Sequence, residues 1–342
     1  MKQMKILFIG ELIDHSRCLL RNKAFLSLGH EVTSVKTFFG EYTSFIEKLT
    51  WKLGLPIDSI KINKNIKRDV AQQDYDVIWI EKGNTLFPWT IKKMREKFPT
   101  AKIVSYSEDD MYAIHNRSWF YTFGLKFYDL VFTTKSYNID ELKGLGAKEV
   151  VFVDKLYDEN AHKPIELKEG DIENFGADVG FIGTFEKERA RSMLYLAKKG
   201  IKVRIWGNGW DGWTGKHENL VVENRPLLGE DYQRGICATK INLCFLRKAN
   251  RDLQTDRTME IPACASFMLA ERTNEHIRLF KEDEEAAYFE SDDELLDKVK
   301  LFLNDDDRRK SIARRGFERC LRSGYSNTDG LKQMLLTIKS LP

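Results

Sequence analysis

Short apolar runs alternate with segments in which apolar residues recur at helical spacing. The first two runs are KILFIGEL (5–12) and EVTSV (31–35), and a helical pattern from Cys18 to Leu28 lies between them. Four more runs follow in the first half of the chain, DVIWIE, AKIVSYS, DLVFTT and EVVFVD. Buried strands that alternate with helices are typical of a parallel sheet covered on both faces, so the first half is predicted to be α/β.

The same alternation starts again in the second half. Between Val153 and Ala177 the periodicity is lost in a polar stretch with one proline and two glycines, which marks a domain boundary. The runs beyond it are DVGFIGT, KVRIWG, NLVVEN, INLCFL, SFMLAE and AAYFES. The pattern predicts two doubly wound domains, 1–165 and 175–322, followed by a segment 323–342.

Length and charge agree with this division and exclude some partners. A chain of 342 residues exceeds the ~100–200 residues usual for one domain, and 42% of its residues are apolar. The 55 basic and 52 acidic side chains are spread along the whole chain. No basic stripe of the kind that binds nucleic acid is present, so a nucleic-acid partner is not expected.

Cysteines and hydropathy indicate a cytoplasmic protein. The five cysteines are odd in number, lack C-x-x-C spacing and mostly lie in apolar runs, which is typical of reduced core thiols. The N-terminal segment has no signal-peptide cleavage pattern. No run approaches the ~18 apolar residues of a membrane-spanning helix, so any membrane contact is expected to be peripheral.

The strand-to-helix turns carry the candidate chemistry, because parallel sheets bind ligands at the carboxyl ends of their strands. The first turn, Gly10 to Arg17, has one glycine and no G-x-G-x-x-G, and EVTSV is not followed by an acidic residue that could hold a ribose. A nicotinamide or flavin cofactor is therefore not expected. In the second domain the turn from Gly183 through Thr184 to Arg189 favours an anion site, and the alternative is a solvated turn with a Glu–Arg pair.

The segment RDLQTDRTMEIPAC (251–264) lies between the runs INLCFL and SFMLAE, so it is predicted to form a turn and helix at the same sheet edge. Glu260 can accept hydrogen bonds from two ribose hydroxyls, and Arg251 and Arg257 can neutralise phosphate oxygens. Asp252 and Glu260 would lie ~12 Å apart on a continuous helix. That separation is too large for a paired acid and base.

These residues resemble the E-x7-E element of retaining GT-B glycosyltransferases, with Asp252 in place of the first glutamate. The closer resemblance is to the CgeB-like (spore protein YkvP/CgeB type) glycosyltransferase family. DVGFIGTFEKERARSMLYLAKKGIKVRIWGNGW resembles the start of its donor domain, and NRDLQTDRTMEIPACASFMLAERTNE its nucleotide-binding core. DVIWIEKGN, VSYSEDDMY, YDLVFTT and GAKEVVFV resemble its N-terminal half, so the resemblance spans nearly the whole chain.

The resemblance implies a GT-B fold, with two Rossmann-like domains facing across a cleft and segment 323–342 returning to the first domain. It implies a hexosyltransferase-like enzyme of cell-surface polysaccharide biosynthesis that needs no metal. The C-terminal domain would hold a nucleotide-diphosphate sugar of UDP or GDP type. The N-terminal domain would hold a hydroxyl acceptor on a glycan, lipid or protein. Retention of configuration is the preferred outcome, although the shorter Asp252 leaves it open.

Carried over by position, the resemblance assigns roles to individual residues. Glu260 would hold the ribose, and Arg251, Thr184 and Arg189 the diphosphate. The glycine-rich turn Gly207-Asn208-Gly209 would lie near the base, between two tryptophans that have an alternative interpretation as core or interface residues.

In the first half, Glu108-Asp109-Asp110 follows a strand but contains no D-x-D metal motif. Asp109 or Asp110 could orient the acceptor or act as a base, and a capping role is an equal alternative. His115 or His15 could contact the transferred sugar.

Other polar residues have structural interpretations. His30 is interpreted as a turn residue before a strand, and His162 as a linker residue. The triplet Asp305-Asp306-Asp307 is interpreted as the cap and first turn of an arginine-rich helix and not as a metal site.

The region from Phe38 to Lys67 mixes aromatic residues with lysines. It could rest on the inner face of an anionic membrane and present a lipid-linked acceptor. The alternative is a helix packed on its own sheet with its lysines in water. Two other functions also stay open, a sugar-nucleotide epimerase of similar fold and a non-catalytic surface or coat-assembly protein.

Overall fold

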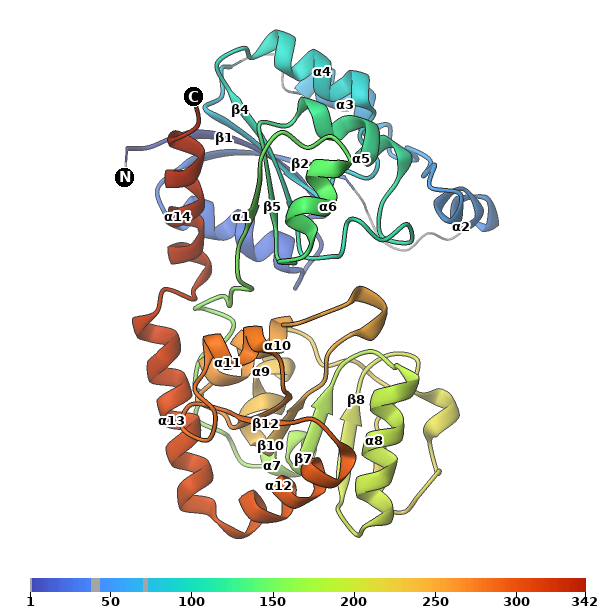
Figure 1. Ribbon diagram of the computed structural model, residues 1–342, viewed down its shortest axis with the longest axis vertical. Helices are drawn as coiled ribbons and strands as arrows, with labels where there is room; N and C mark the ends of the chain where they lie inside the picture. The colour runs from blue at the N-terminus through green and yellow to red at the C-terminus, as the bar shows by residue number, and fades with distance from the viewer. Residues whose placement is uncertain (1, 38–43, 70–72) are drawn as a thin grey trace. The chain divides into compact units, whose positions relative to one another are not determined.

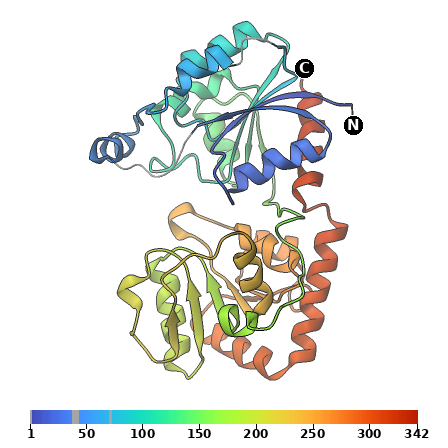
Figure 2. The same cartoon turned by 180° about the vertical axis from the view of Figure 1, so that it is seen from behind.

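The computed structural model describes residues 2–37, 44–69 and 73–342, and the side chains of 67–69 are not described. The chain forms two compact units, the first from Met1–Asp154 with Asn327–Pro342 and the second from Lys155–Ser326. The chain passes between them at the start of the aperiodic polar stretch. Each unit contains a six-stranded parallel sheet with helices on both faces, as the sequence pattern predicts (Figures 1 and 2).

The sheet of unit 1 has the strand order β2-β1-β3-β4-β5-β6. Its strands are β1 (Lys5–Gly10), β2 (Glu31–Lys36), β3 (Val77–Glu81), β4 (Lys102–Ser107), β5 (Leu130–Thr133) and β6 (Val150–Phe152). The central strands are apolar along almost their whole length because both faces are covered, and all four residues of β5 are buried.

The helices of unit 1 are α1 (Arg17–Ser27), α2 (Phe45–Lys52), α3 (Ile62–Asp69), α4 (Pro88–Lys97), α5 (Trp119–Gly124), α6 (Asn138–Gly144) and α14 (Asn327–Lys339). A short 3-10 turn, η1 (Leu125–Phe127), follows α5. The last helix, α14, lies beside α1, so both chain ends belong to this unit (Figure 1). The fold thus joins the two ends of the sequence in one core.

The sheet of unit 2 has the order β12-β11-β10-β7-β8-β9. Its strands are β7 (Ala177–Ile182), β8 (Val203–Trp206), β9 (Leu220–Val222), β10 (Thr239–Cys244), β11 (Met268–Glu271) and β12 (Ala287–Phe289). Its helices are α7 (Asp171–Phe175), α8 (Lys187–Lys198), α9 (Gly229–Ala238), α10 (Asp256–Ala263), α11 (Asn274–Leu279), α12 (Asp292–Asn304) and α13 (Asp306–Arg322), with 3-10 turns η2 (Asp211–Trp213) and η3 (Lys248–Asn250).

Each sheet reverses its strand order at one point, which is where open α/β sheets bind ligands. In unit 1 the reversal lies between β1 and β3, and in unit 2 it lies between β7 and β10. The residues directly after these strands are therefore the first places to look for a site.

Two expectations about the helices can be compared directly with the structure. The Asp305 side chain accepts a hydrogen bond from the Arg308 N–H at 3.0 Å, which confirms the triplet as the start of α13. Within the part of the chain that the structure describes, no helix is long and apolar enough to cross a membrane.

Candidate functional site

The candidate site of unit 2 lies at its strand reversal, after the carboxyl ends of β7 and β10. Arg257 from α10 reaches both strand ends, since its Nη1 donates to the Ile182 carbonyl and its Nη2 to the Phe245 carbonyl, each at 3.2 Å. Arg189 from α8 donates to the carbonyl of Leu246 at 3.0 Å and contacts that of Thr184 at 3.5 Å. These two residues, here called the arginine pair, therefore bridge the two strands that flank the reversal.

The arginine pair shares one aromatic neighbour. The guanidinium carbons of Arg189 and Arg257 lie 5.4 and 5.2 Å from the ring centre of Phe181 on β7. Cation–π attraction to the ring helps to hold two positive groups close together. Phe181 is itself held edge-on by Trp210 and Phe245, so the support beneath the arginine pair is rigid.

The charge of the arginine pair is only partly compensated. Burial and the neighbouring Arg257 lower the pKa of Arg189, and its carboxylate partner is Glu186 at 2.9 Å. Among the described residues, Arg257 has no carboxylate within ion-pair distance, and the buried Nε of each arginine has no hydrogen-bond acceptor. Buried donors normally have acceptors, so the arrangement favours an anion with several oxygens.

The turns after β7 and β8 pack on each other. The Trp210 Nε1 donates to the Gly183 carbonyl at 2.9 Å, and the Phe185 N–H donates to the Asn208 carbonyl at 2.9 Å. Gly207 has φ 152°, and a Cβ there would lie 2.0 Å from the Gly183 oxygen. The close approach that these glycines permit is thus between the two turns.

Some residues of the turns after β7 and β8 are buried in the core, and others are exposed. Trp206 and Trp210 are fully buried, which supports their interpretation as core residues. Thr184, Asn208 and Gly209 are exposed at the same edge. These exposed residues are the ones that a ligand could touch.

The segment 251–264 forms the expected turn and helix. Arg251 has a left-handed φ of 47° and is exposed, and Asp252 accepts a hydrogen bond from Asn250 at 2.8 Å. Thr255 caps α10, which begins only at Asp256. Asp252 and Glu260 are therefore not on one continuous helix, and the separation expected for one does not apply.

Glu260 lies deep on α10, with 4% of its surface exposed. The hydroxyl of Tyr232 on α9 donates to one carboxylate oxygen, and His162 Nε2 lies 3.6 Å from the other. Burial and this carboxylate raise the pKa of Tyr232 well above its ordinary value. His162 Nδ1 accepts the Asp158 N–H at 3.0 Å, so its Nε2 carries the proton that faces Glu260.

The contact of His162 with Glu260 was missed at the sequence level. His162 was interpreted there as a linker residue, and the structure gives it a charged partner on a helix of the same unit. The sequence carries no motif that links the two residues. Tyr232 likewise lies in an ordinary helical pattern, so neither neighbour of Glu260 could be found without the fold.

The residues predicted to act on the acceptor or the sugar in unit 1 lie after β1 and β4, and their environments differ. Asp110 is fully buried, and its Oδ1 accepts the N–H groups of Tyr112 and Ala113 and the Asn138 amide at 2.9–3.3 Å. Its carboxylate therefore organises a turn. The Asp109 side chain is 26% exposed and pairs with Lys82 Nζ at 2.8 Å.

The two histidines at this edge of unit 1, His15 and His115, are exposed. His30, by contrast, is buried, and its Nδ1 accepts the Met4 N–H at 3.2 Å. Burial lowers the pKa of His30, which agrees with its structural interpretation.

The chain is similar to known proteins in part of its sequence and in its fold. A family model described as glycosyl transferase-like matches residues 188–335, which include both arginines of the pair. No curated protein matches the sequence. Among solved structures, sucrose-phosphate synthase from Thermosynechococcus elongatus has a TM-score of 0.70 at 11% identity, covering 98% of this chain and 99% of that one. HepE from Anabaena, in complex with UDP and glucose, has a TM-score of 0.64 at 13% identity, covering 99% and 100%.

The chain has the GT-B fold. A putative UDP-N-acetylglucosamine 2-epimerase from Listeria monocytogenes also superposes, with a TM-score of 0.58 at 11% identity and coverage of 99% and 96%. The fold therefore accommodates more than one reaction on nucleotide sugars, and side chains must distinguish them.

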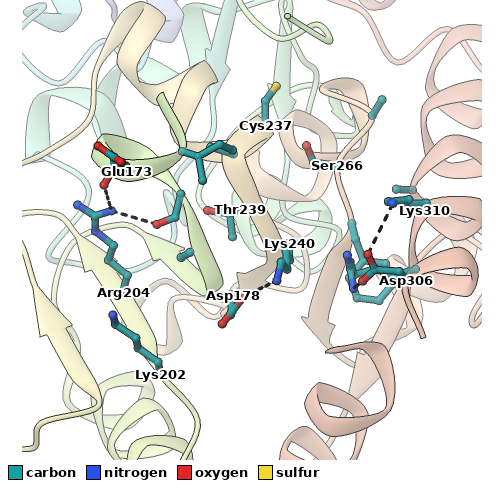
Figure 3. A pocket seen from close by; sticks show the side chains of 18 of the residues that line it. Glu173, Asp178, Lys202, Arg204, Cys237, Thr239, Lys240, Ser266, Asp306 and Lys310 are labelled. Carbon is teal, nitrogen blue, oxygen red and sulfur yellow. Dashed lines mark hydrogen bonds and ion pairs between the residues drawn. The ribbon is translucent and has the colours of Figure 1, made fainter. Parts of the chain in front are cut away.

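A pocket of about 890 Å³ lies at the amino ends of the unit 2 strands, away from the arginine pair at their carboxyl ends (Figure 3). It is lined at the start of the strands by residues such as Ala177, Thr239 and Ser266. Its cations are largely paired, as Lys240 is with Asp178 at 2.7 Å and Lys310 with Asp306 at 3.6 Å. Within the described ranges, no group of three or more histidine, cysteine or acidic residues is arranged to hold a metal ion.

Proposed function

We propose that the protein is a glycosyltransferase that moves a sugar from a nucleotide-diphosphate sugar to a hydroxyl acceptor. The observation that carries this proposal is the arginine pair at the strand reversal of unit 2, where Arg257 has no carboxylate partner among the described residues. A diphosphate supplies several anionic oxygens in a small volume. Two adjacent guanidiniums on a rigid support match that charge.

The donor contacts follow from the positions of the surrounding residues. Arg189 and Arg257, with Arg251, the Gly183-Thr184 turn and the amino end of α10, bind the diphosphate. Glu260 is assigned to the ribose hydroxyls, because a carboxylate is an acceptor for hydroxyl groups, as its hydrogen bond from Tyr232 illustrates. The exposed Asn208 and Gly209, supported by the buried Gly207, are assigned to the base, and Asp252 is assigned to the sugar. UDP or GDP is the proposed carrier, and the UDP complex of HepE supports this choice.

The chemistry requires stabilisation of a leaving diphosphate. The negative charge that develops as the glycosidic bond breaks would be balanced by the arginine pair, whose groups are already oriented by backbone carbonyls and the Phe181 ring. We propose retention of configuration, which the likeness of 252–260 to retaining enzymes supports. The likeness to the CgeB-like family includes the same residues.

Acceptor chemistry is assigned to unit 1. Of its two candidate carboxylates, Asp109 remains partly exposed, whereas Asp110 is buried and occupied by three donors. We therefore assign the orientation or deprotonation of the acceptor hydroxyl to Asp109. The exposed His115 and His15 are candidates for contact with the transferred sugar.

A thermal-shift series with UDP, GDP, dTDP, CDP and ADP tests the donor site. One diphosphate should stabilise the wild type, by about 2.7 kcal/mol at a hundredfold excess over its Kd. Arg257→Ala should weaken that binding ~10–100-fold, because it removes charge-assisted hydrogen bonds of ~1.5–3 kcal/mol. Arg234→Ala is the matched control, since Arg234 is a partly exposed arginine on α9 of the same unit. Stabilisation by none of the nucleotides, or equal stabilisation of Arg257→Ala, would contradict the proposal.

Product analysis separates the transferase from its alternatives. A transferase releases the nucleoside diphosphate faster when an acceptor is present. An epimerase, which the likeness to the Listeria structure makes a specific alternative, converts the donor without any acceptor. A coat-assembly protein that only retains the fold would bind no nucleotide.

A further inference from the structure

Helix α2 of unit 1 has no buried residue. Its apolar side chains face solvent, with Phe45 78%, Ile46 62% and Leu49 45% exposed. The helix projects from the body of unit 1 (Figure 1). The interpretation that this region packs on its own sheet is therefore wrong for α2, and residues 38–43 of the region lie outside the described part of the chain.

The apolar residues of α2 lie on one face. At about 100° per residue, Phe45, Ile46, Leu49 and the following Leu53 fall within an arc of about 100°. Lys48 and Lys52 lie along one border of that arc. The helix is thus amphipathic, and its apolar face, bordered by cations, is exposed to solvent.

The apolar surface continues beyond α2. Trp119 of α5 donates its backbone N–H to the Gly54 carbonyl at 2.8 Å, which fixes the end of α2 beside α5. Trp119 and Phe123 stack with ring centres 5.8 Å apart and are 52% and 58% exposed. We call this surface the α2 patch; it consists of Phe45, Ile46, Leu49, Leu53, Leu55, Trp119 and Phe123.

The charges around the α2 patch indicate the chemistry of its partner. The nearby carboxylates are used locally, since Glu47 forms the capping box of α2 and Asp58 accepts the N–H groups of Ile62 and Asn63. No carboxylate of the described residues lies within ion-pair distance of Lys48 or Lys52. The lysines are therefore available to an anionic surface, and the exposed apolar face of α2 marks an interaction site.

We propose that the α2 patch binds an anionic lipid bilayer, with Phe45, Leu49 and Trp119 in the boundary between headgroups and acyl chains. Lys48 and Lys52 contact the lipid phosphates beside them. A bilayer fits both the aromatic residues and the cations, whereas a protein partner would need carboxylates placed opposite the two lysines. This binding requires neither donor nor acceptor, so it is independent of the proposed glycosyl transfer.

Vesicle flotation of the full chain tests the proposal, with vesicles of phosphatidylcholine alone and vesicles in which about a third of the lipid is anionic phosphatidylglycerol, whose negative surface attracts lysines. The wild type should float with the anionic vesicles only, and less so at high salt. Phe45→Ser with Leu49→Ser, and separately Lys48→Glu with Lys52→Glu, should each reduce the bound fraction at least about tenfold. Leu321→Ser and Lys92→Glu are controls, since both residues are about 61% exposed elsewhere on the chain.

Three outcomes would overturn the proposal. The first is a wild type that does not bind anionic vesicles, and the second is binding of both double variants at the level of the wild type. In the third outcome, lipid-free protein would be a dimer by light scattering and the Phe45→Ser, Leu49→Ser variant a monomer, which would assign the α2 patch to a second copy. Because the substituted residues are exposed, circular dichroism should show that both variants stay folded.

Discussion

Arginines lie beside the strand reversals of both units, Arg21 on α1 in unit 1 and the arginine pair on α8 and α10 in unit 2, but their electrostatic environments differ. In unit 1, Arg21 is 4% exposed and pairs with Glu81 at 2.8 Å and Glu108 at 3.1 Å. In unit 2, Arg257 bonds to carbonyl oxygens, has no carboxylate partner among the described residues and lies near a second arginine. The same topology therefore produces a neutralised ion cluster in one unit and a partly compensated cationic site in the other.

The difference shows how one fold can separate stability from binding. Although burial opposes the charge of Arg21, the carboxylates of Glu108 and Glu81 raise its pKa well above the ordinary value, and its guanidinium lies 4.4 Å from the Tyr106 ring centre. Nε and both terminal nitrogens of its guanidinium contact these two carboxylates inside unit 1. In unit 2, burial and the like-charged neighbour Arg257 lower the pKa of Arg189, so an added anion would stabilise that cluster.

Removing the arginine at each reversal should have the largest and most unequal effects. Arg21→Met should destabilise unit 1 by about 3–5 kcal/mol, because it leaves the mostly buried Glu81 carboxylate without its cation and Glu108 with Arg17 as its remaining cation. Arg257→Met should cost only about 1 kcal/mol, since it breaks two bonds to carbonyls and relieves repulsion with Arg189. Urea unfolding measures both. An equal loss of unfolding free energy in the two variants would mean that Arg21 is no more important for stability than Arg257, despite its ion pairs.

The two arginines at the reversal of unit 2 could be located from the sequence, whereas Arg21 in unit 1 could not. The turn after DVGFIGT and the segment RDLQTDRTMEIPAC identify Arg189 and Arg257 because both adjoin predicted strand ends. Arg21 lies in a comparable helix, yet its partners are 60 and 87 residues away, and only the sheet brings them together. The contact between His162 and Glu260 was unpredictable for the same reason. Strand and helix positions depend on local periodicity, whereas pairing of charges depends on the assembled sheet.

A buried histidine beneath α10 should give unit 2 a pH dependence. His276 donates from Nδ1 to the Glu271 carbonyl at 2.7 Å, so its Nε2 accepts from the Thr258 hydroxyl at 2.8 Å. Burial lowers the pKa of His276 to about 4, while the unfolded side chain titrates near 6.5. The unfolded state therefore binds the proton first, and stability should fall by about 3 kcal/mol as pH drops from 6.5 to 4.

Urea unfolding between pH 7 and pH 4 checks this prediction. His276→Gln should be less stable at pH 7 but should lose the part of the pH dependence that His276 contributes. His115→Gln is the control from the edge of unit 1, because His115 is exposed and its removal should leave the pH dependence unchanged. An unchanged slope in His276→Gln would mean that the folded histidine takes up its proton near the ordinary pKa.

Replacement of Asp109 should have the smallest effect on stability. It also tests whether unit 1 supplies the catalytic carboxylate for the acceptor. Asp109→Asn removes one partly exposed ion pair with Lys82, so it should cost less than about 1 kcal/mol. If Asp109 orients or deprotonates the acceptor, the same variant should slow transfer about 100-fold while donor binding in unit 2 stays unchanged. Asp110→Asn is the matched control, since its Oδ1 can still accept from Tyr112 and Ala113. Loss of transfer in Asp110→Asn alone would reverse the assignment. Full activity in both variants would place the acceptor chemistry on another side chain, and unit 1 would then contribute binding without a catalytic carboxylate at this edge.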